Sequence, residues 1–164
     1  DYFLIVSRLL PYKNVDKAIE ACNELGKKLL VIGRGPEKER LEALAGPTVR
    51  IVSGVSDAQL RYAYRHCLAL LAISYEDFGI TPLEAGASGK AVIAYRAGGF
   101  LDTIQEGKTG MFINQPTVEQ LVEALKAFNP DDWDADYIRE HVDGFSEARF
   151  ISRLKMYVQA LPED

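Results

Sequence analysis

Leu68-Ala69-Leu70-Leu71-Ala72-Ile73 is an unbroken apolar run, and this pattern is typical of a strand that is covered on both faces in a parallel sheet. Five similar short runs, most of them rich in β-branched residues, accompany it at 2–6, 28–32, 48–52, 90–95 and 110–113. The six runs together predict the strands of a six-stranded parallel sheet.

Amphipathic segments lie between these runs. Residues 15–25 place their apolar side chains on one stripe, and Gly26 follows as a C-terminal stop. We expect the next helix to open at Pro36, where the missing N–H costs nothing. Ser56-Asp57-Ala58-Gln59 predicts a capping box for a helix that runs to about His66.

Further helices are expected at 79–88, 100–106, 117–127, 131–140 and 146–160. Because strands and helices alternate with short connections, the chain is predicted to be α/β, with a doubly wound, Rossmann-like parallel sheet. The turn at 129–132 separates a core at 1–128 from a C-terminal helical tail at 129–164, within a single domain of residues 1–164.

Composition limits the function classes. The 164 residues fit one domain, and 48% hydrophobic with 26% charged residues is typical of globular proteins. The net charge of −5 argues against a nucleic-acid partner, because phosphate backbones require clustered Lys and Arg. No apolar run approaches the roughly 20 residues that span a membrane, and the first residues read as a strand without the basic region expected of a signal peptide. It starts at Asp1 without Met and runs directly into a strand, so we expect a piece of a longer protein.

The two cysteines, Cys22 and Cys67, each lie in an apolar helical context. Two free, buried thiols in a reducing cytoplasm are favoured over a disulfide or a metal site.

Several common α/β functions are disfavoured. Gly33-Arg34-Gly35 resembles the start of a dinucleotide fingerprint, but Lys38 stands where the last glycine of G-x-G-x-x-G is needed. Neither a G-x-x-x-x-G-K-[ST] phosphate loop nor a G-x-S-x-G elbow occurs. His66 and His141 have no partners at metal-ligand spacing.

Six motifs follow one another along the chain: Ser7-Arg8-Leu9 with Lys13-Asn14-Val15-Asp16, Val31-Ile32-Gly33-Arg34-Gly35-Pro36, Ser53-Gly54-Val55, Glu76 through Glu84 with its continuation to Gly89, Gly98-Gly99 with Gly107-Lys108-Thr109-Gly110, and Phe145-Ser146-Glu147-Ala148-Arg149-Phe150. In this order they resemble the motifs of glycosyltransferase family 4 (glycosyltransferases group 1), in its C-terminal donor-binding domain. A lone E-x7-E pair would be weak evidence for this family, whereas six motifs in the correct order are a specific signal. The resemblance covers residues 3–127 and 145–160, and it implies the C-terminal half of a GT-B glycosyltransferase.

Three positions depart from the family pattern. Ile73-Ser74 replaces Pro-Ser, Gly89-Lys90-Ala91-Val92 replaces G-x-P-V, and Asn14 replaces the glycine after the family lysine. These departures affect loop shape more than ligand chemistry.

The site must bind a diphosphate, which gains negative charge as the sugar–phosphate bond breaks. Arg8 offers a planar fork for phosphate and Lys13 a compact ammonium, and both follow the first strand, where ligands of open parallel sheets bind. The resemblance assigns catalytic roles to Arg8, Lys13 and Glu76, with Glu76 hydrogen-bonding the donor sugar. A solvated basic loop is the alternative for the two cations.

The helix expected at 79–88 presents a positive N-terminus to an anion, and Gly79 permits close approach of the backbone. By resemblance, the stretch Phe78, Gly79, Ile80 and Thr81 contacts sugar and diphosphate. Gly98 and Gly99 either extend this cradle or form a plain turn.

Glu84 has two competing interpretations. By resemblance it binds the ribose hydroxyls, for which an ionised carboxylate is a suitable acceptor. Thr81-Pro82-Leu83-Glu84 also reads as a capping box with Pro at the first helical position, which would use Glu84 to close the helix. Gly33, Arg34 and Val55 are assigned to the base by their position in the family pattern alone.

The resemblance implies sugar transfer with retention of anomeric configuration, without cofactor or metal. The run from Glu76 to Pro82 looks most like bacterial and archaeal mannosyltransferases of polysaccharide assembly, so the favoured donor is GDP-mannose, with UDP-sugars open. A non-catalytic nucleotide-binding module and a nucleotide-sugar epimerase are the alternatives. We expect a separate N-terminal domain to bind the glycan or lipid-linked acceptor, this piece to bind donor without transferring sugar, and the whole enzyme to be cytoplasmic, at the inner membrane face if the acceptor is lipid-linked.

Overall fold

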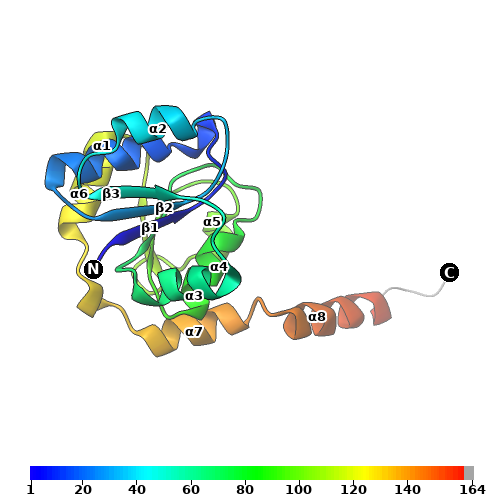
Figure 1. Ribbon diagram of the computed structural model, residues 1–164. Helices are drawn as coiled ribbons and strands as arrows, with labels where there is room; N and C mark the ends of the chain where they lie inside the picture. The colour runs from blue at the N-terminus through cyan, green and yellow to red at the C-terminus, as the bar shows by residue number, and fades with distance from the viewer. Residues whose placement is uncertain (161–164) are drawn as a thin grey trace.

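The computed structural model describes residues 1–160 and contains a six-stranded parallel sheet of order β3-β2-β1-β4-β5-β6 (Figure 1). The strands are β1 (Phe3–Val6), β2 (Leu29–Ile32), β3 (Val49–Val52), β4 (Leu70–Ala72), β5 (Val92–Tyr95) and β6 (Gly110–Ile113). All five strand pairings are parallel, with Leu4 opposite Leu30 on one side and Leu70 on the other. The predicted doubly wound α/β sheet is therefore confirmed.

Helices connect the strands and cover both faces of the sheet. They are α1 (Val15–Leu25), α2 (Lys38–Leu44), α3 (Asp57–His66), α4 (Ile80–Ala87), α5 (Phe100–Thr103), α6 (Val118–Ala127), α7 (Ala135–Asp143) and α8 (Glu147–Gln159), with short 3-10 turns η1 (Pro11–Lys13) and η2 (Pro130–Asp132). Figure 1 shows α1, α2 and α6 on one side of the sheet and α3, α4 and α7 on the other.

Each face of the sheet has its own apolar core. On the first, Ile19 of α1 and Leu121 of α6 pack with the buried Ile5 of β1. On the second, Ala85 of α4 and Phe100 of α5 pack with Leu4 of β1. Alternate residues of β1 thus enter opposite cores, which explains why its strand is apolar throughout.

Several helix ends follow the sequence signals. Gly26 ends α1 with a left-handed φ of 61°. The capping box of α3 is present: the Ser56 hydroxyl accepts from the Gln59 N–H at 3.3 Å, and the Gln59 side chain accepts from the Ser56 N–H at 2.8 Å.

Other boundaries were wrong. Pro36 lies in a turn, and α2 begins two residues later at Lys38. The helix expected at 131–140 begins at Ala135, because the Asp134 carboxylate accepts the N–H groups of Asp136 and Tyr137 at 2.9 and 3.0 Å. The helix expected at 100–106 ends at Thr103, since Ile104 adopts an extended conformation.

Helix α8 extends away from the rest of the molecule (Figure 1). It has no buried residue, and its exposed apolar side chains include Phe150, Ile151, Leu154, Tyr157 and Val158. The tail expected at 129–164 thus contains α7 and α8, and its last four residues lie outside the described part of the chain. Among residues 1–160, no helix has the length and apolar character needed to cross a membrane.

Candidate functional site

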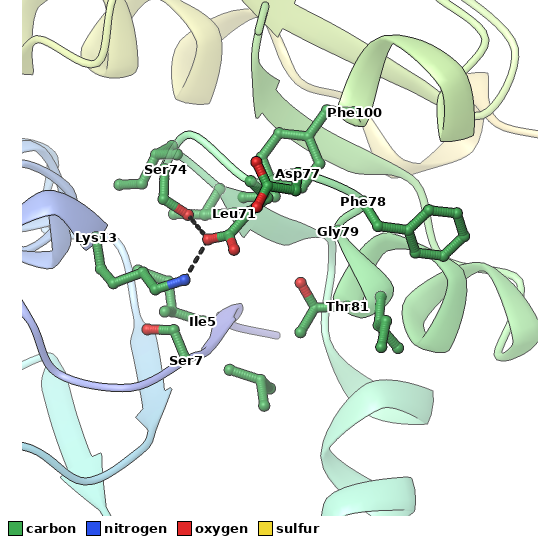
Figure 2. Close-up of a pocket in the computed structure, with 15 residues that line it drawn as sticks. Ile5, Ser7, Lys13, Leu71, Ser74, Asp77, Phe78, Gly79, Thr81 and Phe100 are labelled. Carbon is green, nitrogen blue, oxygen red and sulfur yellow. Dashed lines mark hydrogen bonds and ion pairs between the residues drawn. The ribbon is translucent and has the colours of Figure 1, made fainter. Parts of the chain in front are cut away.

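The main pocket lies at the carboxyl edge of the sheet, where the strand order reverses between β1 and β4. Such switch points are where open α/β sheets bind ligands, because the flanking loops diverge there. The cavity has a volume of about 360 Å³ and is lined by the ends of β1 and β4, by Lys13 of η1, and by the loop and first turn that lead into α4. Figure 2 shows these side chains around it.

Lys13 and Glu76 meet inside this pocket. The Lys13 ammonium forms an ion pair with Glu76 Oε1, and the Ser74 hydroxyl donates a hydrogen bond to the same oxygen (Figure 2). The Lys13 side chain is only 10% exposed, and its Nζ lies 4.8 Å from the centre of the Tyr12 ring. Two predicted site residues that are 63 positions apart are therefore brought into direct contact.

Asn14 holds these two segments together, and the sequence interpretation missed this role. Its φ of 55° is left-handed, a conformation that Asn tolerates better than most residues. Its side-chain amide donates to the Ile73 carbonyl at 2.8 Å, which ties the end of η1 to the end of β4. The departure from the family glycine was the only signal for this contact.

The N-terminus of α4 faces the pocket through Gly79, Ile80 and Thr81. The helix begins at Ile80 without a side-chain cap, so its first N–H groups have no intrahelical acceptor. Gly79 has a φ of 79°, and a Cβ there would lie 2.5 Å from the Phe100 ring. Glycine is required at this position, and the free N–H groups make it suitable for an anion.

Gly98 and Gly99 support the loop that carries Glu76 and do not line the pocket among the described residues. The Gly99 N–H donates to the Glu76 carbonyl at 2.8 Å. A Cβ on Gly98 would lie 2.2 Å from that carbonyl oxygen, and one on Gly99 would lie 2.4 Å from Phe78 Cα. Their small size lets two backbone segments touch, so they support the loop that carries Glu76. A contact of Gly98 and Gly99 with the ligand stays a prediction.

The capping-box interpretation of Glu84 is wrong. The N-cap of α4 is Gly79, two residues before Thr81, so Pro82 is the third residue of the helix and not the first. The Glu84 carboxylate instead accepts a hydrogen bond from the Tyr64 hydroxyl of α3 at 2.6 Å. Glu84 lines a second cavity, between α3 and α4.

Comparison with known proteins identifies the family. The sequence model of the family "Glycosyl transferases group 1" matches residues 1–142. The chain belongs to this family.

Two relatives illustrate the sequence similarity of this chain to known proteins. Glycogen synthase of Pseudomonas syringae pv. syringae (strain B728a) is 34% identical over 133 residues, which cover 75% of this chain and 27% of that protein. The GDP-mannose-dependent alpha-(1-6)-phosphatidylinositol monomannoside mannosyltransferase of Mycobacterium tuberculosis (strain CDC 1551 / Oshkosh) is 30% identical over 138 residues, 73% of this chain and 36% of that protein. The chain thus spans about a quarter to a third of the length of these relatives.

Solved structures share the group 1 fold. Sucrose-phosphate synthase (tll1590) from Thermosynechococcus elongatus superposes with a TM-score of 0.84 at 24% identity, covering 97% of this chain and 45% of that one. Anabaena Alr3699/HepE, solved in complex with UDP, superposes with a TM-score of 0.81 at 17% identity. The match covers 98% of this chain and 49% of that one. The matched architecture is that of GT-B glycosyltransferases.

The remaining predicted site residues of this group 1 chain lie near the same edge of the sheet but outside the main pocket. Arg8 follows β1 and is exposed, Gly33 and Arg34 follow β2, and Val55 lies between β3 and α3. Glycine is needed at position 33 for packing, because a Cβ there would lie 2.1 Å from the Ser7 carbonyl oxygen. The described residues that line the pocket include none of these four.

Ser7 is a pocket residue that the sequence interpretation did not single out. Its hydroxyl is buried at the end of β1, and within residues 1–160 it has no hydrogen-bond partner. Buried hydroxyls are normally paired, so this one is available to a bound molecule.

The cysteines are free and buried, as predicted. Burial raises the pKa of Cys22 to about 12 and that of Cys67 to about 11, so both thiols are unreactive near neutral pH. Among the described residues, no cluster of three or more His, Cys, Asp or Glu side chains is arranged to hold a metal ion.

Proposed function

We propose that this chain is the sugar-nucleotide-binding domain of a retaining glycosyltransferase. The observation that carries the proposal is the Lys13–Glu76 pair, which faces the open N-terminus of α4 across a pocket at the switch point of the sheet. A cation, a carboxylate and free backbone N–H groups in one cavity match the diphosphate and hydroxyl groups of a sugar nucleotide.

The diphosphate is assigned to the α4 N-terminus and Lys13. The N–H groups of Ile80 and Thr81 and the helix dipole stabilise negative charge there. Because the Lys13 ammonium has three donors, it keeps hydrogen-bonding capacity for phosphate while paired with Glu76. These fixed positive groups stabilise the leaving diphosphate as its charge grows. Arg8, exposed at the same edge, is assigned to the outer phosphate oxygens.

The donor sugar is assigned to Glu76. Its Oε1 already accepts from Lys13 and Ser74, which fixes the carboxylate in the pocket and leaves Oε2 for sugar hydroxyls. The Ser7 hydroxyl, which has no hydrogen-bond partner within residues 1–160, is assigned as a second contact for the same ligand.

GDP-mannose is the favoured donor. It is supported by the run from Glu76 to Pro82 and by relatives from two strains that are named as GDP-mannose-dependent. A glycogen-synthase-like activity is the second candidate, because relatives of that name share up to 37% identity with this chain. Transfer is proposed to need no metal and to require a separate acceptor-binding domain, so this chain alone binds donor without transferring sugar. The whole enzyme is proposed to act in the cytoplasm on a glycan or lipid-linked acceptor.

Calorimetry of the chain with GDP, UDP and ADP and their sugar conjugates tests the donor site. We expect saturable binding of one nucleoside diphosphate. Absence of binding to all of them by the folded protein would refute the proposed function.

Substitution of the two cations tests the phosphate assignment. Lys13→Ala and Arg8→Ala should each weaken binding of the preferred nucleoside diphosphate by about 1.5–3 kcal/mol, the contribution of a charged hydrogen bond. Lys17→Ala is the matched control, because that lysine lies on α1 beside Asp16 and Glu20 and outside the pocket. Unchanged affinity in both test variants would place the phosphates elsewhere.

A further inference from the structure

Tyr64 is a buried tyrosine whose hydroxyl bonds to a charged group. It lies in the last half of α3, its residue is 3% exposed, and its hydroxyl donates to Glu84 Oε2 on α4 at 2.6 Å. Its ring packs in the apolar core of that face of the sheet. Glu84 itself is exposed, so the contact links a rigid, buried donor to a carboxylate at the surface.

The Tyr64 hydroxyl keeps its proton over the whole working range of pH. Burial, together with the hydrogen bond to Glu84 and the charge of that carboxylate, raises the pKa of Tyr64 well above its ordinary value. The phenol is therefore a permanent donor to Glu84. A carboxylate accepts through both oxygens, so a donor on Oε2 fixes its orientation while Oε1 stays available to another hydroxyl.

Glu84 does not line the main pocket, but it follows closely on α4 after a residue that does. Thr81, which lines that pocket, lies one helical turn before Glu84, and residues three apart share one side of a helix. Glu84 lines a separate cavity of about 370 Å³ between α3 and α4, together with Asp57, Leu60 and Arg61 of α3. A ligand with its diphosphate at the α4 N-terminus would therefore meet Glu84 next along the helix.

We propose that Tyr64 is a positioning residue that holds the Glu84 carboxylate in the orientation needed to accept hydrogen bonds from the two ribose hydroxyls of the donor. The inference rests on the proposed function and on the contact with the ribose hydroxyls that the sequence resemblance implies for Glu84. It assigns Tyr64 no contact with the ligand: the residue acts through Glu84, and its loss should affect recognition of the ribose and of nothing else.

Comparison of each nucleotide with its dideoxy analogue isolates the role of Tyr64. The 164-residue chain is titrated by calorimetry with GDP and UDP and with their 2′,3′-dideoxy analogues, which lack the hydroxyls that Glu84 would bind. In the Tyr64→Phe variant, affinity for the preferred ribonucleotide should fall by about tenfold, in line with the loss of an orienting hydrogen bond to a charged group, while affinity for its dideoxy analogue should not change. Tyr62→Phe is the matched control, because Tyr62 lies on the same helix with 63% of its surface exposed.

A Glu84→Ala background provides the second variant. There, Tyr64→Phe should have no further effect on ribonucleotide affinity, because the carboxylate that it positions is gone. An equal loss for ribo- and dideoxynucleotides, or an undiminished effect in the Glu84→Ala background, would overturn the inference in favour of a general packing role. Unchanged ribonucleotide affinity in Tyr64→Phe would overturn it while leaving the donor site intact.

The failure of the proposed function has a different signature. In that case the wild-type protein binds neither GDP nor UDP, and both the donor site and the role of Tyr64 are refuted together. Thermal unfolding of Tyr64→Phe accompanies the titrations, so that lost affinity is read only from folded protein.

Discussion

Asn14 shows how one side chain places two others. It stands at the junction of η1 and α1 in a left-handed conformation, and its amide reaches the Ile73 carbonyl at the end of β4. Lys13 precedes it directly, and Glu76 follows Ile73 by three residues. The hydrogen bond therefore fixes the distance between the two loops that carry the ion pair.

Two substitutions separate the backbone and side-chain parts of this role. Asn14→Gly keeps the left-handed backbone and loses the hydrogen bond, so the free energy of unfolding should fall by about 1 kcal/mol. Asn14→Ala also incurs the left-handed strain, so the loss should reach about 2–3 kcal/mol. Urea unfolding of both variants measures this difference. Equal stability of the Gly and Ala variants would show that the backbone conformation is unimportant.

Helices α6 and α8 are both amphipathic, but only α6 packs its apolar side chains into the core. Apolar residues of α6, including Leu121 and Leu125, are buried in the core. Helix α8 buries none of its residues. Amphipathic periodicity thus predicted both helices correctly, but it carried no information about which apolar stripe this chain covers.

A matched pair of leucines tests this difference. Leu121 of α6 is fully buried, so Leu121→Ala should lower the free energy of unfolding by about 2–5 kcal/mol through lost burial and a cavity. Leu154 of α8 is 50% exposed, so Leu154→Ala should change it by no more than about 0.5 kcal/mol. Chemical denaturation of the two variants provides the comparison. A large loss for Leu154→Ala would mean that α8 packs against a surface in solution.

Over the whole molecule, both cores contain a buried thiol. Cys22 lies in the core under α1, and Cys67 lies in the core on the opposite face. Burial raises both pKa values above the ordinary 9.0, mainly because the thiolate would lose its hydration. Their contribution to stability is therefore complete below about pH 9 and is lost as the pH rises toward about 11 and 12.

The direction of this pH dependence follows from proton release. Above about pH 9 the unfolded chain gives up thiol protons that the folded protein keeps, so the free energy of unfolding should decrease with rising pH. Urea unfolding between about pH 8 and about pH 10 measures the slope before most tyrosines ionise. A Cys22→Ala/Cys67→Ala double variant should show a flatter dependence. The same slope in the wild type and in this variant would assign the effect to other groups.

Much of the fold was predictable because its signals are local. The six apolar runs predicted six strands, since strands that are covered on both faces need apolar residues at every position. Gly26 and the Ser56–Gln59 capping box marked helix ends through backbone geometry and hydrogen bonds that span only a few residues. One boundary failed because a competing local bond decided it: the Asp134 carboxylate caps α7 and moves its start to Ala135.

The strand-and-helix order, the family motifs and the glycine at the start of α4 follow from the amino-acid sequence alone. Which side chains meet depends on the tertiary structure, which pairs Lys13 with Glu76, Asn14 with Ile73, and Tyr64 with Glu84. It also shows that Glu84 does not cap its own helix and that Gly98 and Gly99 pack against the loop that carries Glu76. The physical reason is that these contacts join residues 20 to 63 positions apart, so they exist only after parallel strands bring their carboxyl ends to one edge of the sheet.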